Sequence, residues 1–401
     1  MTVNDITNFS LSVANGERVD LPRTGIEVTL SDSIYHLSPV MTVTSPDSAG
    51  FLIGARAGGY GITYDFEMTV NHRVAKYPFR ADHFEVSDLK SGTSAMSGTY
   101  RITLTHGLMY QPSEMRAYKN QSPSDILKTI INEYGTNNFK SYSDIEASSP
   151  LDMETIYNPN LTPGKFIEEI LLPLSSSTTN EINNPFYVFI DAQNRFKFMT
   201  LKSMLQQRDI RTLLITNQQS LVGVEEFNNG DYIRATAAVP FSQEYSHIYD
   251  SIDTETCRIE NGEFSSIDSS LIKIAGAYQL GFYDRKKSTS QYMSEDFFQT
   301  SDAMLRLQAG INYKNRKSYM IDKLVVYSVL DLDLCAGTRV KLQSYYGNSE
   351  EPMTSYTGEY IIESSVHKWD SNFNSGTTQL VLGTPAPYIT QSLIASKAYG
   401  G

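Results

Sequence analysis

The chain has little of what would place it in a secreted, disulfide-rich or membrane-spanning class. Its 401 residues include two cysteines and one tryptophan, and no stretch approaches the ~20 apolar residues that cross a bilayer. Two cysteines cannot build the disulfide framework of a small secreted scaffold. Cys257 and Cys335 are far apart in sequence. A disulfide between them stays open, but two buried or half-buried thiols in a reducing cytoplasm are favoured.

Long runs of like charge are also missing. The chain has 33 Lys and Arg against 45 Asp and Glu, which gives a net charge of −12. An acidic protein has no general electrostatic attraction for nucleic acid or for an anionic membrane. The compact basic patch at 285–287 is interpreted as a solvated turn. The first ten residues lack the basic and apolar regions of a secretory signal, so no stable membrane insertion is expected.

Motifs for catalysis and for metal binding are not found. None of the six histidines stands in HxxxH or HExxH spacing or beside a CxxC pair, and no GxSxG elbow occurs. His367 is expected on the polar face of a strand, as a solvated or core-edge side chain. The glycine cluster at 50–61 opens no phosphate-binding helix, and the acidic scatter at 250–263 lacks calcium-loop spacing. The sequence therefore predicts no catalytic, cofactor-binding or metal-binding residues, although glycosidase carboxylates far apart in the chain stay open.

What the chain does have is β texture, with 26 Tyr and 18 Phe. Residues 318–384 contain strand-like runs at 323–330, 338–344, 358–369 and 377–382, separated by turns rich in Gly and Asn. The alternation of apolar and polar residues predicts antiparallel strands with one wet face. These strands need partners from earlier in the chain, so they complete a sheet or barrel that begins elsewhere.

The middle of the chain has a different texture, typical of a small α+β unit. A first helix is predicted between the cap Ser122 and the stop Gly135, with Ile and Leu at helical spacing. A second helix is predicted from the cap Thr162 to Pro173. A hairpin follows, with strands at 186–190 and 196–201 and a turn at 191–194.

The strand counts indicate two similar β domains. Residues 1–106 contain about six strand-like runs at short spacing, which predicts a small barrel or sandwich. Short strands at 213–215, 221–227 and 231–239, with the final four, reach a similar number. The polar stretch between them is expected to hold a strand at 271–275 and a helix at 301–315. The predicted fold class is mainly β with α+β parts: two similar antiparallel β-barrel domains, a small α+β domain and an insert. The predicted domains are a first barrel at 1–108, an α+β helix-hairpin domain at 109–206, a discontinuous second barrel at 207–245 and 316–385, an insert with a return helix at 246–315, and a C-terminal tail at 386–401.

Several short segments carry a resemblance through their order and spacing over most of the chain. They lie at 32–35, 40–43, 117–127, 166–171, 186–190, 195–198, 276–278, 306–308, 334–340 and 358–367. Residues 334–340 match an L-x-x-G-x-x-V strand entry, with Ala336 where proline is usual. In this order the chain resembles the baseplate hub subunit of tailed bacteriophages, as in T-even phages, and the base of type VI secretion spike proteins.

This resemblance implies a structural virion protein of the tail baseplate, not an enzyme, assembled in the host bacterial cytoplasm. Hub subunits form a homotrimer with a central channel, and their two similar barrels give a pseudo-six-fold ring. Such a ring joins a hexameric tail tube to a central spike. The implied partners are the tail tube protein, the spike protein and baseplate wedge or other tail proteins. DNA would pass through the channel without specific binding, and the net charge leads us to expect an acidic channel wall.

Two other function classes stay open. Aromatic residues on β strands would also suit a receptor- or carbohydrate-binding tail protein, although core and interface roles are the usual ones. Binding to a glycan array would favour this alternative. A baseplate-associated cell-wall hydrolase is less favoured, since no stretch looks like a lysozyme domain, and digestion of peptidoglycan would test it.

Overall fold

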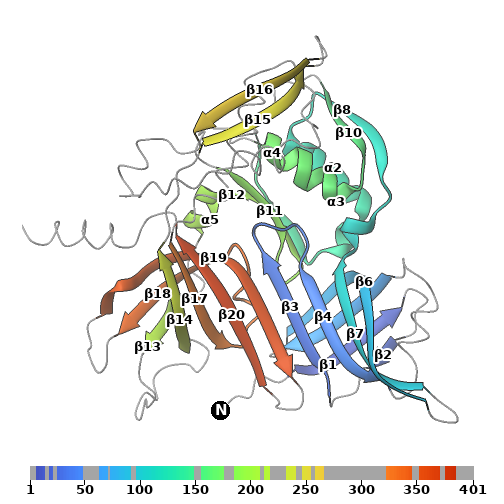
Figure 1. Cartoon of the computed structure of the whole chain (residues 1–401), viewed down its shortest axis with the longest axis vertical. Helices are drawn as coiled ribbons and strands as arrows, with labels where there is room; N and C mark the ends of the chain where they lie inside the picture. The colour runs from blue at the N-terminus through green and yellow to red at the C-terminus, as the bar shows by residue number, and fades with distance from the viewer. Residues whose placement is uncertain are drawn as a thin grey trace, which may run out of the picture.

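Most of the described strands join one large sheet. A computed structural model describes residues 6–13, 18–20, 25–47, 63–70, 73–91, 96–148, 155–175, 185–207, 212–216, 232–240, 246–253, 258–265, 322–345, 352–370 and 375–384. Its main sheet has 13 strands in the order β18-β13-β14-β17-β20-β19-β3-β4-β7-β6-β5-β1-β2. Figure 1 shows the sheet as two sets of strands side by side, with the helices of the middle of the chain above them.

The first set of strands comes from the N-terminal part of the chain. It consists of β1 (Ile6–Val13), β2 (Arg18–Asp20), β3 (Glu27–Ser33), β4 (Val40–Asp47), β5 (Thr63–Val70), β6 (Arg73–Ser91) and β7 (Met96–His106). All pairs within this set are antiparallel. Burial alternates along β3, where Val28 and Leu30 are buried and Glu27 is exposed. This alternation is what a strand with one covered and one open face requires.

The second set comes from the C-terminal half of the chain. It consists of β13 (Thr212–Thr216), β14 (Tyr232–Pro240), β17 (Asp322–Val329), β18 (Arg339–Tyr345), β19 (Pro352–Asp370) and β20 (Ser375–Thr384). These strands pair in the order β18-β13-β14-β17-β20-β19. Because β18 also pairs with β19, the pairings of this set return to their starting strand.

The two sets repeat one order of pairing. The first contains β3-β4-β7-β6-β5 and the second contains β14-β17-β20-β19-β18, and the strands follow the same order along the chain. β6 and β19, which hold corresponding places, are each 19 residues long. Each also has an irregularity at a corresponding place, between Ala81 and His83 in β6 and between Ile362 and Ser364 in β19. The next strand differs, because β1 is antiparallel to β5 whereas β13 is parallel to β18.

One antiparallel pairing joins the two sets into a continuous sheet. The last part of β19 pairs with β3, from Ser364 opposite Ser33 to Asp370 opposite Glu27. The first part of β19 pairs with β18 instead. The long strand therefore contributes to its own set with one part and reaches the other set with the rest.

Between the two sets the chain forms an α+β unit. Its elements are η1 (Gly107–Tyr110), β8 (Glu114–Lys119), α2 (Pro123–Tyr134), η2 (Thr136–Asn138), β9 (Ser141–Ile145), β10 (Thr155–Leu161), α3 (Pro163–Phe166), η3 (Ile167–Leu171), α4 (Leu172–Leu174), β11 (Phe186–Ile190), β12 (Arg195–Thr200) and α5 (Leu201–Gln206). β11, β12 and β9 form one small sheet, and β8 with β10 forms another. A separate hairpin, β15 (Ser246–Asp253) with β16 (Arg258–Ser265), lies within the stretch expected to be an insert.

Helix α2 begins and ends where the sequence predicts. The Ser122 hydroxyl accepts a hydrogen bond from the Asp125 backbone N–H at 3.2 Å, Pro123 occupies the first turn, and the Gly135 N–H donates to the Ile131 carbonyl at 3.0 Å. The second helical segment begins after its predicted cap Thr162, and its predicted end at Pro173 lies one residue before the observed end. The segment contains a π-type turn at Ile167–Leu171 and continues to Leu174, because a proline is tolerated in the first turn of the helical stretch after that wider turn.

Other sequence-based elements differ from the structure or lie outside the part that it describes. The predicted strands at 221–227 and 271–275 and the helix at 301–315 fall outside the described residues. The strands β8, β9 and β10 and the hairpin of β15 and β16 were not predicted. These short strands carry weak alternation, so their pairing partners decide their structure more than their own sequence does.

Two hydrophobic clusters attach the α+β unit to the sheet. One consists mainly of residues of this unit, but it also includes Leu37 from the connection between β3 and β4 and Leu108 beyond β7. The other draws on both sets of strands and on the unit, with Ile34, Tyr187, Phe189, Met199, Leu201, Met204, Ala336 and Ile361. The three parts of the chain therefore share buried apolar surface.

We expect Gly337→Ala to lower the stability of the protein by more than about 2 kcal/mol, because a Cβ there would overlap the Phe189 ring and because the backbone has φ +73°. Thermal and urea denaturation would measure the change. Thr377→Ala, at an exposed position of β20, is the control and should stay within about 0.5 kcal/mol of the parent. Equal stability of the two variants would show that the close approach of this turn to Phe189 contributes nothing.

Candidate functional site

The turn between β11 and β12 is buried, although turns usually lie at the surface. Its residues Asp191, Ala192, Gln193 and Asn194 are 0%, 0%, 8% and 3% exposed. A buried turn must satisfy its polar groups with partners from other segments. The partners here come from both sets of strands and from the rest of the α+β unit, so the turn lies where the three parts meet.

Asp32, at the end of β3, binds this turn to the second set of strands. One of its carboxylate oxygens accepts the N–H groups of Ala192 at 2.7 Å and of Ala336 at 2.9 Å. Its other oxygen is hydrogen-bonded to the Ser365 hydroxyl on β19. One side chain thus joins β3, the buried turn, the connection between β17 and β18, and β19. Burial raises the pKa of Asp32 to about 6, against the lowering effect of these hydrogen bonds.

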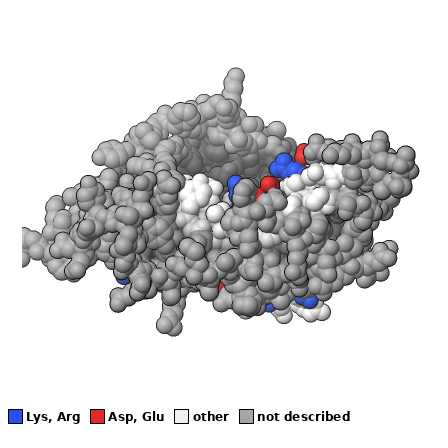
Figure 2. Space-filling model, turned by 90° about the horizontal axis from the view of Figure 1, so that it is seen from below, with Lys and Arg blue, Asp and Glu red and all other residues white. Residues whose placement is uncertain are grey.

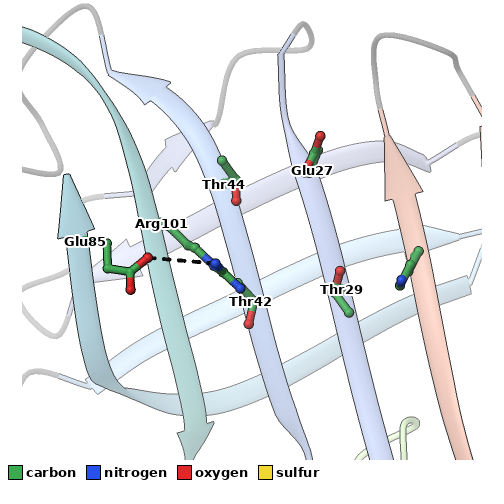
Figure 3. A pocket seen from close by; sticks show the side chains of 7 residues that line it. Glu27, Thr29, Thr42, Thr44, Glu85 and Arg101 are labelled. Carbon is green, nitrogen blue, oxygen red and sulfur yellow. Dashed lines mark ion pairs between the residues drawn. The ribbon is translucent and has the colours of Figure 1, made fainter. Parts of the chain in front are cut away.

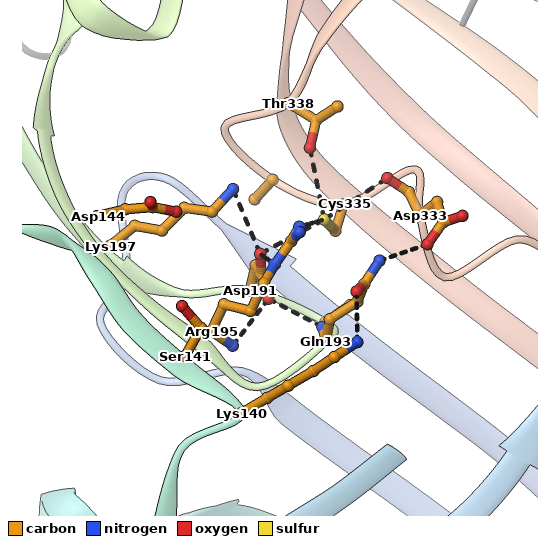
Figure 4. A network of polar contacts seen from close by, with 12 residues as sticks. Lys140, Ser141, Asp144, Asp191, Gln193, Arg195, Lys197, Asp333, Cys335 and Thr338 are labelled. Carbon is orange, nitrogen blue, oxygen red and sulfur yellow. Dashed lines mark hydrogen bonds and ion pairs between the residues drawn. The ribbon is translucent and has the colours of Figure 1, made fainter. Parts of the chain in front are cut away.

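Gln193 makes a second connection between the α+β unit and the second set. Its amide oxygen accepts a hydrogen bond from the Lys140 ammonium group at 2.8 Å. Its amide nitrogen donates to the Leu332 carbonyl at 3.1 Å and to the Asp333 carboxylate at 2.6 Å. Figure 4 shows Gln193 between Lys140 on one side and Asp333 on the other.

Asn194 and Ala192 connect the same turn to the first set. The Asn194 amide nitrogen donates to the Lys76 carbonyl in β6 at 2.9 Å and to the Asn138 carbonyl at 3.0 Å. Asn194 adopts φ 60°, which asparagine tolerates better than most residues. The Tyr77 hydroxyl, also from β6, donates to the Ala192 carbonyl.

Asp191 forms the charged centre of the junction (Figure 4). Arg195 Nε lies 2.7 Å and Lys197 Nζ 3.3 Å from its carboxylate. Burial alone would raise the pKa of Asp191, but the two cations lower it below its ordinary value. An ion pair of this kind adds little over an apolar core when intact, but removing one partner leaves an uncompensated buried charge.

Cys335 is a buried free thiol in the same network. Arg195 Nη2 donates to its sulfur at 3.1 Å, and burial raises the pKa of the thiol to about 12. A protonated, enclosed thiol is a structural group and a poor nucleophile. The prediction of a buried thiol is confirmed for Cys335, and Cys257 lies outside the described residues.

Beyond Asp32, the hydrogen bonds continue through β19 and β20. Ser365 Oγ lies 2.8 Å from His367 Nε2, and His367 Nδ1 lies 3.0 Å from the Thr378 hydroxyl. Here serine lies between the carboxylate and the imidazole, whereas a nucleophilic triad has the imidazole in the middle. All four side chains are also buried, so the arrangement is suited to holding strands together.

The expectation that His367 lies on a polar strand face is wrong. His367 is 2% exposed, because the bulge at Glu363 shifts the alternation and places Ser365 and His367 on the covered face. His106 is also fully buried and stacks on Phe139 at 5.1 Å. Burial lowers the pKa of His367 to about 3 and of His106 to about 4.

The opposite, open face of the sheet crosses the boundary between the two sets. It contains a polar pocket of about 790 Å³ over β19, β3, β4, β7 and β6, which Figure 3 shows from close by. Its lining residues are Glu27, Thr29, Thr42, Thr44, Glu85, Arg101 and Lys368. Cross-strand pairing places the charged residues in neighbouring rows, with Glu27 opposite Asp370 and Arg101 opposite Glu85.

This face carries charges of both signs. Arg101 Nη1 lies 3.8 Å from the Glu85 carboxylate, with more than half of each side chain exposed. Basic and acidic side chains of described residues also lie next to one another near the centre of the view from below (Figure 2). Exposed pairs at this distance contribute little to stability, so their effect is to balance the local potential. Among the charged residues of the pocket and their cross-strand partners, three are acidic and two are basic: Glu27, Glu85 and Asp370 against Arg101 and Lys368.

Towards the other end of the same face the side chains are less polar. Val325, Val366 and Val381 are half-buried there, and Tyr327 is 38% exposed. Within the described residues, no three His, Cys, Asp or Glu side chains are grouped so that they could hold a metal ion. No helix in the described part of the chain has the length and apolar character needed to cross a membrane.

Comparison with known proteins gives a likeness of fold. No family model matches the chain, and no curated protein matches its sequence. The structure is similar to that of the E. coli c3393 protein, a component of the type VI secretion system described as similar to T4 bacteriophage tail proteins gp27 and gp5. That match has a TM-score of 0.50 and 12% identity, and it covers 94% of this chain and 76% of the other. The 43 kDa tail protein of prophage MuSo2 from Shewanella oneidensis matches with a TM-score of 0.49 and 10% identity, over 94% of this chain and 98% of the other. The tail protein of Neisseria meningitidis MC58 matches with a TM-score of 0.48 and 9% identity, over 95% of this chain and 97% of the other. The resemblance to hub proteins and to the base of type VI spike proteins is confirmed as a likeness of fold over most of the chain.

The buried groups of the junction predict how stability depends on pH. Between pH 6.5 and about 4, His106 and His367 take up protons only when the protein unfolds, so they destabilise the fold as the pH falls. Asp32 acts in the opposite direction, because its folded pKa of about 6 exceeds its unfolded value of 3.8. Together, these three groups should lower the free energy of unfolding by about 1.4 kcal/mol for each pH unit of acidification between pH 6 and 4.

Asp32→Asn tests this account, because asparagine keeps an acceptor for the two N–H groups and removes the opposing titration. Between pH 6 and 4 the variant should lose stability about twice as steeply as the parent, by roughly 2.7 kcal/mol per pH unit from His106 and His367. Urea denaturation at several pH values would measure both slopes. A variant slope equal to or shallower than that of the parent would contradict the assigned states.

Proposed function

We propose that this protein is a structural component of a bacteriophage tail, the baseplate hub. In this proposal three copies form a ring that joins a hexameric tail tube to a central spike. The ring has pseudo-six-fold character because each chain contributes two similar β units, and its central channel lets DNA pass. The protein would be located in the tail baseplate of the virion after assembly in the host bacterial cytoplasm.

The repeated order of strands is the observation that carries this proposal. A chain that presents the same five-strand arrangement twice can adapt three-fold symmetry on one side to six-fold symmetry on the other without changing the number of chains. The likeness of fold to the type VI secretion component adds support, because that protein is described as similar to phage tail proteins gp27 and gp5. A simple binding module has no comparable need for two matched units.

Each set of strands would form a β-barrel in the assembled hub. The pairing of β18 with β19, which brings the second set back to its starting strand, supports this for the second unit. The proposed domains are 1–108 and, discontinuously, 207–245 with 316–385 for the two barrels. The α+β domain would span 109–206, the insert 246–315 and the tail 386–401.

The open face that crosses both sets is the surface best suited to line the channel. Its threonines are small and polar, and the two basic residues Arg101 and Lys368 offset all but one of the negative charges of Glu27, Glu85 and Asp370. A wall with so small a net charge neither binds the phosphate backbone strongly nor repels it. DNA would therefore pass without specific binding. The tail tube protein, the spike protein and wedge or other tail proteins would bind at the ends and the periphery of the ring.

The proposed role is structural and not catalytic. Among the described residues, Asp32, Ser365 and His367 are the set closest in type to a hydrolase site, but they are buried and the serine lies between the carboxylate and the imidazole. Such a chain positions strands and cannot reach a substrate. In the proposed hub, the buried junction holds the two β units together, and the open face lines the channel.

Electron microscopy of the purified protein at high concentration tests the proposal. We expect end-on views of a ring with a central hole, three-fold in mass and nearly six-fold in outline, because the two β units are similar in arrangement. A candidate spike protein should be added if the protein alone stays monomeric. Isolated elongated monomers in both samples would contradict the hub and favour a receptor- or carbohydrate-binding tail protein.

A further inference from the structure

The two sets of strands share a place at which a neighbouring set can attach. Within the chain, one edge of β19 pairs with two strands in turn: its first part pairs with β18, and its last part pairs with β3. By the repeated order of pairing, β6 corresponds to β19 and β14 corresponds to β3. The pairing of β19 with β3 therefore has a counterpart in which β6 would pair with a β14.

The edges needed for that counterpart are open in the described part of the chain. β5 pairs with β6 only from Arg73 to Arg80, and within the described residues no strand pairs with the same edge from 83 to 91. β13 pairs with β14 only at Tyr232 and Ile233, and no described strand pairs with that edge from 234 to 240. Unpaired edges of this length present rows of free backbone N–H and C=O groups, which favour pairing with another chain.

We propose that residues 84–90 of β6 in one copy pair antiparallel with residues 234–240 of β14 in the next copy. The contact would repeat between chains the pairing that β19 and β3 make within a chain. This inference rests on the proposed hub, and it specifies the strands that close the ring. In Figure 1, β14 lies within the left set of strands and β6 within the right set, so the contact would join two different edges of the molecule. A contact between two different edges is head-to-tail, which forms a closed ring when the rotation between copies is suitable.

The bulges define the register of the contact. The bulge of β6 at position 82 corresponds to the bulge of β19 at position 363, so Ser87 corresponds to Lys368. Ala237 of β14 corresponds to Thr29 of β3, because each is joined by two successive pairings to the strand next to the bulge. Ala237 pairs with Val325 and Val325 with Val381, while Thr29 pairs with Thr42 and Thr42 with Thr103. Lys368 lies opposite Thr29 within the chain. The equivalent contact between copies places Ser87 opposite Ala237.

Neighbouring positions show which face of β6 the contact would extend. Glu85, two residues before Ser87, would lie opposite Val239 of the next copy. The side chain of Glu85 is 54% exposed and that of His83 is 62% exposed, so both point to the open face. The open face of each copy would then continue into that of the next copy.

Cysteine pairs test the register directly. Residues opposite each other in an antiparallel ladder have Cα atoms about 4.5–5.5 Å apart, which lies within the range of about 4.4–6.8 Å that a disulfide spans. Ser87→Cys with Ala237→Cys should give covalent trimers on mild oxidation, seen on non-reducing gels. All variants should carry Cys257→Ser, and the buried Cys335 can stay.

Two control pairs make the result specific. Lys368→Cys with Thr29→Cys should form a disulfide within one chain, because these residues are paired in the structure. Ser87→Cys with Ala238→Cys should give roughly ten times less covalent trimer, because neighbouring residues of a strand point to opposite faces. Mixing the separate single variants Ser87→Cys and Ala237→Cys should give covalent dimers only between different chains.

Sedimentation of the same samples separates this inference from the hub proposal. Trimers without the Ser87–Ala237 bond, alongside an intact Lys368–Thr29 control, would overturn the strand pairing and leave the hub standing. Monomers under all conditions, with no bond between chains, would overturn both. Equal bonding through Ala237→Cys and Ala238→Cys would overturn the register, because a paired strand presents only one of the two positions to its partner.

Discussion

The structure depends on the burial of one turn, residues 191–194, between two sets of strands from opposite ends of the chain. The peptide and side-chain groups of this turn bind β3 through Asp32, β6 through Lys76 and Tyr77, and the connection between β17 and β18 through Leu332 and Asp333. Each of these groups would be costly to bury alone, by about 1–3 kcal/mol. Their mutual satisfaction therefore fixes where both sets lie relative to the α+β unit.

The proposed ring would need such a constraint, because its two similar units must keep one fixed arrangement. The pairing of β19 with β3 makes one sheet from the two sets, and the buried turn supports that pairing from the covered side. The open side is then free to carry small polar side chains and charges of both signs. In the proposed hub, stability and function would be divided between the two faces of one sheet: the covered face holds the units together, and the open face would line the channel.

The sequence predicts the elements whose signals are local. Helix α2 follows from Ser122, Pro123 and Gly135, and the strands of both sets follow from alternation, as in β3. It does not predict the burial of the turn, because the partners of the turn are distant: Asp32 is 160 residues from Ala192, and Asp333 is 140 residues from Gln193. Nor does it predict the covered position of His367, because one bulged residue, Glu363, reverses the alternation without a local signal. The junction was therefore missed, although the turn itself was expected at the right residues.

Hydrogen exchange of the whole protein, compared between the parent and Asp191→Asn, tests the central claim most directly. The substitution keeps the shape of the side chain but removes the charge that holds Lys197 and Arg195. If the buried turn couples the parts, exchange should become faster together in 27–33, 331–338 and 361–370, which are far apart in sequence. Faster exchange confined to 185–200, with β3 and β19 unchanged, would contradict the account.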